Sequence, residues 1–215
     1  MKYSRLLLSA ALIAAILPAT GCFRKREHVA SKKDTPVPKE SLKGSGKLYL
    51  VPLGDFPTDI ADDLTSFYRD KYKLEIETLP SVPLSEVAVN QKRDQLIAEQ
   101  VVAIMKRANP QITNDPDAIM IGLATQDMYV NQKGWRFAFS WRDEGRYAVV
   151  SSARMYLPLG RWKITEKLMV KRLRKMVTKN VGILYYHLPP NDNPRSVLYR
   201  NVGGIRELDY MREDF

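Results

Sequence analysis

Few side chains in this 215-residue sequence are of the kinds that bind metals. The chain has one cysteine, Cys22, and two histidines, His28 and His187. A catalytic zinc site usually takes three protein ligands from His, Cys, Asp and Glu. His28 lies in a basic segment, and the one carboxylate close to His187 in the sequence is Asp192. The ligand count therefore predicts no metal and no other cofactor.

Three lysines recur at a spacing of four residues: Lys171, Lys175 and Lys179. At this spacing their side chains lie on one face of a helix. Two interpretations stay open. The row is either a solvated basic surface or one wall of a cleft that favours acidic peptides or anionic polymers. A divalent cation is not expected beside it, because charged ammonium groups repel a cation.

Cys22 follows a segment that is typical of an export signal. A short positive start precedes an apolar run, residues 6–17, that is too short to cross a bilayer, which needs about 20 residues. Residues 19–22 (Ala-Thr-Gly-Cys) are similar to a lipobox, the site that lipoprotein signal peptidase cuts. We expect residues 1–21 to be removed and lipid on Cys22 to anchor the chain to a membrane.

Two further interpretations of this N-terminal segment stay open. One is an ordinary secretory signal with a chance cysteine, and the other is an N-terminal membrane anchor. If the chain is a lipoprotein, it belongs to the cell envelope. Phe23, rather than Asp, follows the cysteine. By resemblance to Gram-negative sorting rules, this favours the outer membrane, facing the periplasm, if the host is Gram-negative.

Residues 22–46 are predicted to form a flexible tether. They have no apolar periodicity and cannot bury enough surface to offset the entropy of ordering. The chain carries a net charge of +10, and residues 1–47 hold 10 basic and 3 acidic side chains. The basic charge thus lies mainly outside the predicted domain, which argues against a nucleic-acid partner. Contact of the tether with anionic lipid or cell-wall polymer stays open.

Residues 47–215 have the length of one domain with its own core. We expect strands at 48–53, 74–79, 118–123, 135–141 and 146–151, and helices at 57–72, 91–107 and 165–181. Residues 142–145 (Arg-Asp-Glu-Gly) are typical of a hairpin turn. Thr165 is expected to cap the last helix and Gly182 to end it, with a loop-rich segment after it. This order predicts an α/β fold: a single domain with a mixed, mainly parallel twisted sheet and flanking helices.

Aromatic side chains alternate along one predicted strand. They are Trp135, Phe137, Phe139 and Trp141. Alternate residues of a strand share one face. Either this face packs in the core, or the strand lies at an exposed edge of the sheet and lines a cleft. An exposed edge strand can bind an extended peptide by strand addition.

Four short strings resemble, in the same order, those of the archaemetzincins, a family of zinc metalloproteases. They are 48–54 (LYLVPLG), 126–129 (QDMY), 136–139 (RFAF) and 148–155 (AVVSSARM). The resemblance extends over nearly all of residues 47–215. It implies a metzincin-like α/β domain, with a zinc site on the helix that follows Arg154.

The zinc motif that this resemblance implies, H-E-x-x-H-x-x-G-x-x-H, is not present. In the motif two histidines at i and i+4 bind zinc, the glutamate is the general base, and the glycine lets the third histidine reach the metal. The aligned positions hold Lys175, Met176, Lys179, Gly182 and Tyr185. The glycine is retained, while the ligands and the base are not. The resemblance therefore implies a degenerate member of the family, with no catalytic residue.

Two functions from different classes follow. In the first, the chain is an envelope lipoprotein whose domain is catalytically dead and binds or scaffolds a peptide or an envelope polymer. In the second, it is a zinc-dependent peptidase of the archaemetzincin family that uses atypical ligands. Fold alone does not decide between them, because one scaffold can serve many functions.

Overall fold

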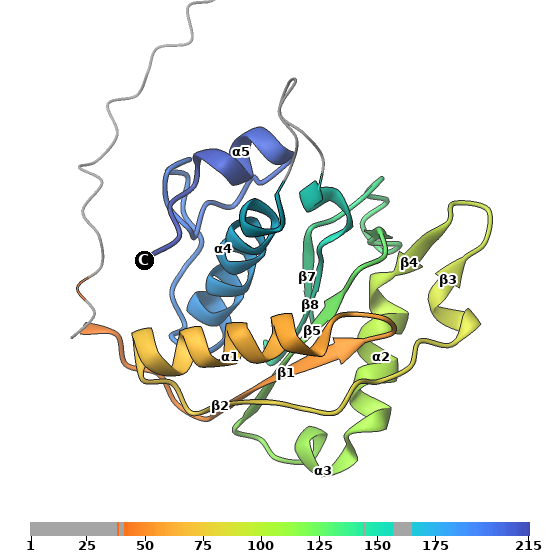
Figure 1. Ribbon diagram of the computed structural model, residues 1–215, viewed down its shortest axis with the longest axis horizontal. Helices are drawn as coiled ribbons and strands as arrows, with labels where there is room; N and C mark the ends of the chain where they lie inside the picture. Colours follow the sequence, from red (N-terminus) through yellow and green to blue (C-terminus); the bar gives the residue numbers. More distant parts are fainter. Residues whose placement is uncertain (1–37, 39–40, 144, 157–164) are drawn as a thin grey trace, which may run out of the picture. The chain divides into compact units, whose positions relative to one another are not determined.

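The computed structural model describes residues 38, 41–143, 145–156 and 165–215. The expected signal peptide, Cys22 and most of the expected tether therefore lie outside the described residues. The main sheet has the strand order β2-β1-β5-β8-β7 (Figure 1). Its strands are β1 (Lys47–Leu53), β2 (Ile76–Thr78), β5 (Ala118–Ala124), β7 (Ser140–Asp143) and β8 (Tyr147–Ser151). Neighbouring strands are parallel except for the β7–β8 pair, so the expected mixed, mainly parallel sheet is confirmed.

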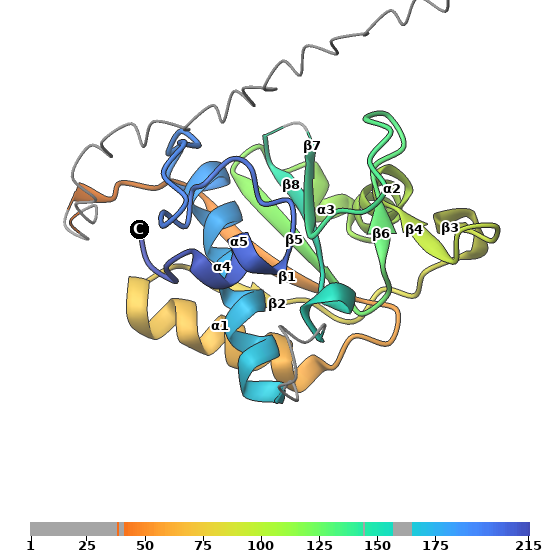
Figure 2. The ribbon, with the colours of Figure 1, turned by 90° about the horizontal axis from the view of Figure 1, so that it is seen from above.

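Helices cover both faces of this sheet (Figure 2). Helices α1 (Thr58–Tyr72) and α4 (Glu166–Leu184) pack on one face, and α2 (Ala98–Ala108) packs on the other. All seven residues of the central strand β5 are buried because both faces are covered. Its side chains alternate between the two cores: Ile119 and Ile121 lie on the α1 and α4 side, and Met120 on the α2 side. The expected single α/β domain with flanking helices is confirmed.

A second, three-stranded sheet accounts for one wrong prediction. Its order is β3-β4-β6, with β3 (Val89–Asn90), β4 (Gln95–Ile97) and β6 (Met128–Tyr129). The helix expected over 91–107 begins only at Ala98. Asp94 has a left-handed backbone, φ 50°, which breaks a helix, and the next three residues form β4, which pairs with β6.

The strand expected over 135–141 is shorter than predicted, because β7 begins at Ser140. The residues before it pair elsewhere: the Trp135 amide donates to the Val130 oxygen, and the Ala138 amide to the Met128 oxygen. The chain therefore follows β6 first and joins β8 only from residue 139 onward. The predicted hairpin is confirmed, since β7 pairs antiparallel with β8, although Arg142 and Asp143, expected in its turn, belong to β7. β7 is the edge strand of the main sheet.

Helix α4 begins as predicted and ends later than predicted. The Thr165 hydroxyl accepts a hydrogen bond of 3.3 Å from the Leu168 amide, so the expected cap is confirmed. The helix continues through Gly182 to Leu184. The left-handed residue that follows is His187, φ 53°. The prediction that Gly182 ends the helix is therefore wrong.

The C-terminal segment contains a short helix that its sequence pattern did not indicate. Helix α5 (Ile205–Tyr210) has six residues, too few for a clear periodicity, and it contacts α4. A one-turn helix α3 (Pro110–Thr113) and two 3-10 turns (Glu86–Ala88 and Ala153–Tyr156) complete the elements. Within the described residues, none of the helices is both long enough and apolar enough to traverse a bilayer.

Candidate functional site

The lysine row on α4 does not form one continuous basic surface. Lys171 is exposed, whereas Lys175 and Lys179 are each 4% exposed. The reason is that α4 packs on the sheet with one side while residues of the C-terminal segment, such as Leu208 and Phe215, belong to the same core. Two lysine side chains at the expected ligand positions are therefore buried inside the protein.

Lys175 is held by the end of α5. Its ammonium group donates hydrogen bonds of 2.9 Å to the main-chain oxygens of Leu208 and Asp209. These carbonyls lie in the last turn of α5, where helix carbonyls lack partners within the helix. Burial lowers the pKa of Lys175, although the nearby Asp209 carboxylate opposes the shift. The side chain thus caps a helix with a positive charge, which favours that helix end.

Lys179 has a different environment, one turn further along α4. Its ammonium group donates to the main-chain oxygen of Tyr199. Burial, together with the positive charge of Arg142 on β7, lowers the pKa of Lys179 to about 8. Within the described residues, no carboxylate forms an ion pair with Lys179.

Asn180, next to Lys179 on α4, connects this helix to edge strand β7. Its oxygen accepts a hydrogen bond of 3.0 Å from Arg142 Nη1. Its amide nitrogen donates to Ser140 Oγ at 2.9 Å and to the main-chain oxygen of Met176 at 2.8 Å. Because Asn180 is fully buried, this network fixes the position of the Arg142 guanidinium.

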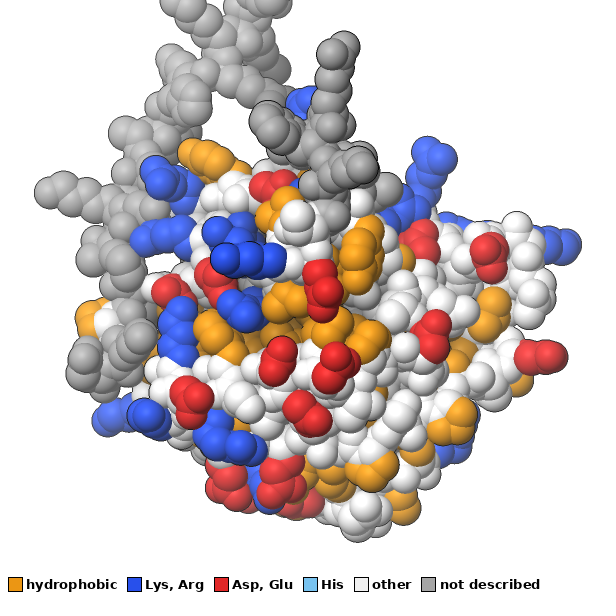
Figure 3. Space-filling view, in the orientation of Figure 1, with side chains coloured by type: hydrophobic (Ala, Val, Ile, Leu, Met, Phe, Trp, Pro, Cys, Tyr) orange, Lys and Arg blue, Asp and Glu red, His pale blue; other side chains and the backbone are white. Residues whose placement is uncertain are grey.

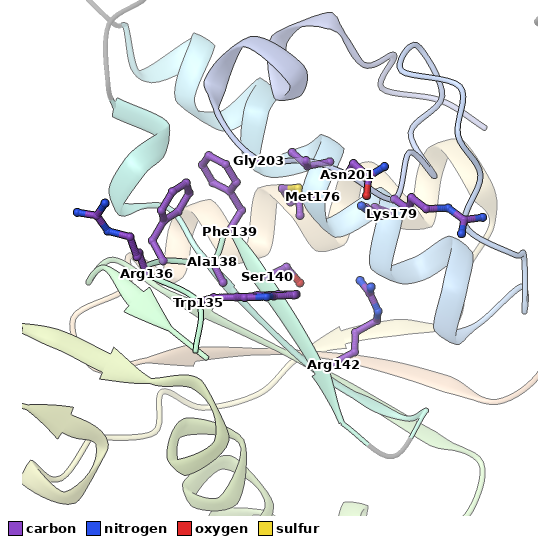
Figure 4. A pocket seen from close by; sticks show the side chains of 13 residues that line it. Trp135, Arg136, Ala138, Phe139, Ser140, Arg142, Met176, Lys179, Asn201 and Gly203 are labelled. Atoms are coloured by element: carbon purple, nitrogen blue, oxygen red, sulfur yellow. The ribbon is translucent and has the colours of Figure 1, made fainter. Parts of the chain in front are cut away.

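A pocket of about 460 Å³, lined by Ser140, Arg142 and Lys179 among others, lies between β7 with its preceding segment, α4 and residues 200–203 (Figure 4). Phe139 lies toward one end of the pocket, on the same side as Arg136. Lys179 and Arg142 lie toward the other end, and Met176 lies between the two ends. Four cationic side chains line the pocket in total: Arg136, Arg142, Lys179 and Arg200. No carboxylate is among its described lining residues. The pocket is therefore suited to a ligand with negative charge and an apolar part.

The structure brings together part of the predicted site. Trp135, Phe137, Phe139, Met176 and Lys179 line the pocket, while Trp141, Lys171, Lys175 and Tyr185 do not. Trp141 packs on the α2 side of the sheet. The expectation that all four aromatic side chains share one face is wrong, because regular alternation begins only at Ser140.

Sequence reasoning missed Arg142, Ser140 and residues 200–203. The alternation of side chains along β7 could have identified Arg142 and Ser140, because residues 140 and 142 lie on the face opposite Trp141. Residues 200–203 had no such signal. They lie in a loop that reaches the pocket only through the packing of the C-terminal segment.

Gly182 and Tyr185 are used for packing. A Cβ on Gly182 would lie 2.5 Å from Phe215 Cε1 and 2.8 Å from Leu198 Cδ2, so only glycine allows this close approach. The ring of Tyr185 lies against Gly44 and against the ring of Tyr186, 4.9 Å away between centroids. The glycine is thus retained at the aligned position, but it does not turn the chain toward a third ligand.

The residues at the aligned positions do not fit a zinc ion. A lysine binds a metal only after it loses its proton, and the ammonium group of Lys175 donates to two main-chain carbonyls outside the pocket that Lys179 lines, so the two side chains do not converge on one ion. Met176 has no acidic group that could act as a base. Among the described residues, no three His, Cys, Asp or Glu side chains come together in a metal-binding group. No chemical step through a metal can be derived at this helix.

A partly buried ion pair joins two of the four strings that carry the family resemblance. Arg154 donates two hydrogen bonds, 2.8 and 2.7 Å, to the carboxylate of Asp127, and Gln95 donates a third of 2.6 Å. Although burial raises the pKa of Asp127, the hydrogen bonds from Arg154 and Gln95 lower it below its ordinary value overall. These residues hold β4, β6 and the segment after β8 together, so this retained pair is structural.

Known proteins share this architecture. No protein-family model matches the chain. The archaemetzincin of Natronomonas pharaonis is 26% identical over 168 residues, which are 77% of this chain and 92% of that protein. The archaemetzincin of Archaeoglobus fulgidus, solved in complex with malonate, has a TM-score of 0.61 and 20% identity, covering 79% of this chain and 94% of that one. The archaemetzincin of Methanopyrus kandleri has a TM-score of 0.60 and 22% identity, covering 80% of this chain and 91% of that one.

A third solved structure, a zinc-dependent peptidase from Methanocorpusculum labreanum, has a TM-score of 0.64 and 18% identity, covering 78% of this chain and 95% of that one. The matches cover 77–80% of this chain and 91–95% of each relative. The order of strings in the sequence, the α/β architecture and these matches agree. The chain is therefore archaemetzincin-like in sequence and in fold.

Proposed function

We propose that the chain is a cell-envelope lipoprotein whose archaemetzincin-like domain binds an acidic peptide without zinc and without cleaving it. One observation carries the proposal. Two buried lysines occupy the positions aligned with zinc ligands, and one of them, Lys179, faces a pocket without a carboxylate partner among the described residues.

The end of the pocket that holds Lys179 and Arg142 favours a carboxylate guest. A buried charge is costly unless it is paired, and here Lys179 and Arg142 repel each other. A ligand carboxylate would accept hydrogen bonds from both and remove that repulsion. Charge-assisted hydrogen bonds of this kind are about twice as strong as neutral ones.

The edge strand offers main-chain groups to the same ligand. Strand β7 pairs with β8 on one side, and no described strand pairs with its other side. An extended peptide could add to this edge, with alternate side chains entering the pocket. Trp135 is 49% exposed and lines the pocket, which makes it a contact for an apolar residue of the peptide.

A peptide fits the charge distribution better than a long anionic polymer does. On the face shown in Figure 3, acidic and basic side chains are interspersed and no single sign covers the surface. Residues 48–215 hold 24 basic and 21 acidic side chains, so the domain has little excess charge. Lys179, a buried cation with no carboxylate partner among the described residues, lies at the pocket, which suits one carboxylate group at a time.

Membrane attachment rests on Cys22 and the apolar run before it. Replacement of Cys22 by Ser should prevent acylation and move the protein from the membrane fraction to the soluble envelope fraction. Fractionation without detergent is the measurement. Retention of the variant in the membrane as firmly as the original chain would overturn the lipoprotein part of the proposal.

Binding is tested by calorimetry with the full chain in detergent. The probe is a short, end-blocked peptide of alternating valine and glutamate, compared with its valine and lysine counterpart. The acidic peptide should bind, and Arg142→Met should weaken binding about tenfold or more, as expected for a lost charged hydrogen bond. Lys171→Met, on the same helix but outside the pocket, is the matched control. Equal binding of both peptides would overturn the proposal.

The second candidate is a zinc-dependent peptidase with atypical ligands. The likeness to a solved zinc-dependent peptidase favours it. Metal analysis after dialysis separates the two functions. Stoichiometric zinc together with cleavage of the acidic peptide would establish the second candidate and exclude the first.

A further inference from the structure

We propose that Lys179 is a nucleophilic amine that captures the carbonyl group of an apolar 2-oxo acid as an imine. This activity goes beyond peptide binding and does not depend on it. The inference rests on the position of Lys179 in the pocket, on its few hydrogen-bond partners, and on the guanidinium groups around it.

The amine has room for a covalent partner. Among the described residues, its one hydrogen-bond partner is the main-chain oxygen of Tyr199. A neutral amine that donates one N–H to this carbonyl keeps its lone pair free for the pocket. Lysines that are desolvated, or that lie next to another cation, are the ones that proteins use as nucleophiles. Both conditions hold for Lys179, which is buried and close to Arg142.

Lys175, the other buried lysine of the row, lacks these features. Its ammonium group donates to two main-chain oxygens, and the Asp209 carboxylate favours the charged form. Lys175 also does not line the pocket. Lys171 is exposed and lies outside the pocket. The chain therefore carries two internal controls on the same helix.

The rest of the pocket selects the class of carbonyl compound. Arg142, fixed by Asn180, presents a planar guanidinium beside Lys179 that can bind a carboxylate. A carboxylate next to the reacting carbonyl defines a 2-oxo acid. Met176 lies between Lys179 and Phe139, so an aromatic or branched side chain on that acid would be buried against Met176 and Phe139.

The reaction balances without an oxidant or a metal. The unprotonated amine attacks the carbonyl carbon, the C=O π bond breaks, the oxygen takes a proton from solvent, and the nitrogen releases one to solvent. The resulting carbinolamine then loses water, so that amine plus carbonyl gives imine plus water. No carboxylate or histidine is among the described residues that line the pocket, so these side chains supply no acid or base for further steps. The outcome is reversible capture.

Charged groups around the amine make the reaction depend on pH. Arg142 faces it from β7, and Arg136 and Arg200 line the same pocket. Burial and the Arg142 charge lower the pKa of Lys179 to about 8. The attack on the carbonyl should therefore be faster at pH 8.5 than at pH 6.5 by about 25-fold, because the reactive form is the unprotonated one.

The test uses the full chain in detergent with phenylpyruvate and cyanoborohydride, which reduces the imine and makes it permanent. Intact mass and peptide mapping should find one adduct per chain, on Lys179. Lys179→Met should remove this adduct, and Lys171→Met should leave it. Arg142→Met should slow labelling by phenylpyruvate about tenfold but not labelling by phenylpropanal, which lacks the carboxylate.

Peptide mapping of the unsubstituted chain decides the matter even if Lys179→Met fails to fold. Phenylpropionate, which has no carbonyl to react, should protect Lys179 when it is added in excess. The proposal would be overturned by adducts spread evenly over the surface lysines. It would also be overturned if excess phenylpropionate did not lower the yield of the adduct on Lys179. Neither result would affect the binding of the acidic peptide, which is measured without the oxo acid.

Discussion

The ammonium group of Lys175 on α4 lies 2.9 Å from the main-chain oxygen of Leu208 on α5. With its second hydrogen bond, to Asp209, this side chain holds the last turn of α5. Lys175→Met keeps much of the volume but leaves two buried carbonyls without a donor. We expect the free energy of unfolding to fall by about 1–3 kcal/mol. Urea unfolding measures it, and the exposed Lys171→Met should change stability by less than about 0.5 kcal/mol.

Asp209 also neutralises a buried guanidinium. Arg172 is 1% exposed and donates to both carboxylate oxygens of Asp209, at 2.8 and 2.7 Å. Asp209→Ala would leave this charge buried without its partner, which costs about 3–5 kcal/mol. Adding Arg172→Met should recover part of the loss, because the unpaired charge is then gone. Additive losses in the double variant would show that the pair is not coupled.

Stability should depend on pH through Lys179. Its pKa is about 8 in the folded protein and 10.5 in its ordinary state. Between pH 8 and 10 the unfolded chain keeps a proton that the folded chain releases, so the unfolding free energy rises with pH. One pKa unit corresponds to about 1.4 kcal/mol, and we expect a gain of about 1–3 kcal/mol over this range. Lys175, whose pKa is also lowered, contributes in the same direction.

The rise of the unfolding free energy with pH should end near pH 10. Burial raises the pKa of Tyr68 and Tyr72, so above pH 10 the unfolded chain loses phenolic protons that the folded chain keeps, and stability falls again. Lys179→Met should flatten the rise between pH 8 and 10 and leave the fall above it. Denaturant unfolding at a series of pH values is the measurement. An unchanged profile in the variant would mean that Lys179 is not the group that titrates.

The fold could be predicted where one pattern of apolar residues extends over a whole segment. β5 is an unbroken apolar run, and α4 begins at a threonine cap, so both were found. The helix expected over 91–107 failed because its first residues form β4, which pairs with β6 about 30 residues further along the chain. Local periodicity does not contain that long-range pairing.

The site was harder to predict for a related reason. The row of lysines was visible in the sequence, but its burial was not, since the groups that accept from Lys175 and Lys179 are main-chain carbonyls. Every residue has a main-chain carbonyl, so the sequence does not show which ones will be acceptors. Only the packing of α5 and residues 199–203 on α4 places them there.

Gly182 should be sensitive to substitution because of Phe215. Gly182→Ala gains about 1 kcal/mol of helix propensity, but its Cβ would lie 2.5 Å from the Phe215 ring. Overpacking of this kind costs about 1–3 kcal/mol, so we expect a net loss in thermal or urea unfolding. In a background that already carries Phe215→Ala, Gly182→Ala should cost less. An equal cost in both backgrounds would indicate a role in the backbone conformation rather than in packing.

Rebuilding the zinc motif should fail at its third ligand. Lys175→His, Met176→Glu and Lys179→His together restore two histidines on one helical face, which can bind zinc weakly. In the family motif the third ligand follows a turn at the glycine, but here α4 continues through Gly182 to Leu184. Position 185 is thus six residues beyond 179, or about 9 Å along the helix axis, and its side chain packs against Gly44. Adding Tyr185→His should therefore not tighten zinc binding, as measured by isothermal titration. Much tighter binding by the quadruple variant than by the triple one would mean that the chain can turn at Gly182, contrary to the continuous helix described above.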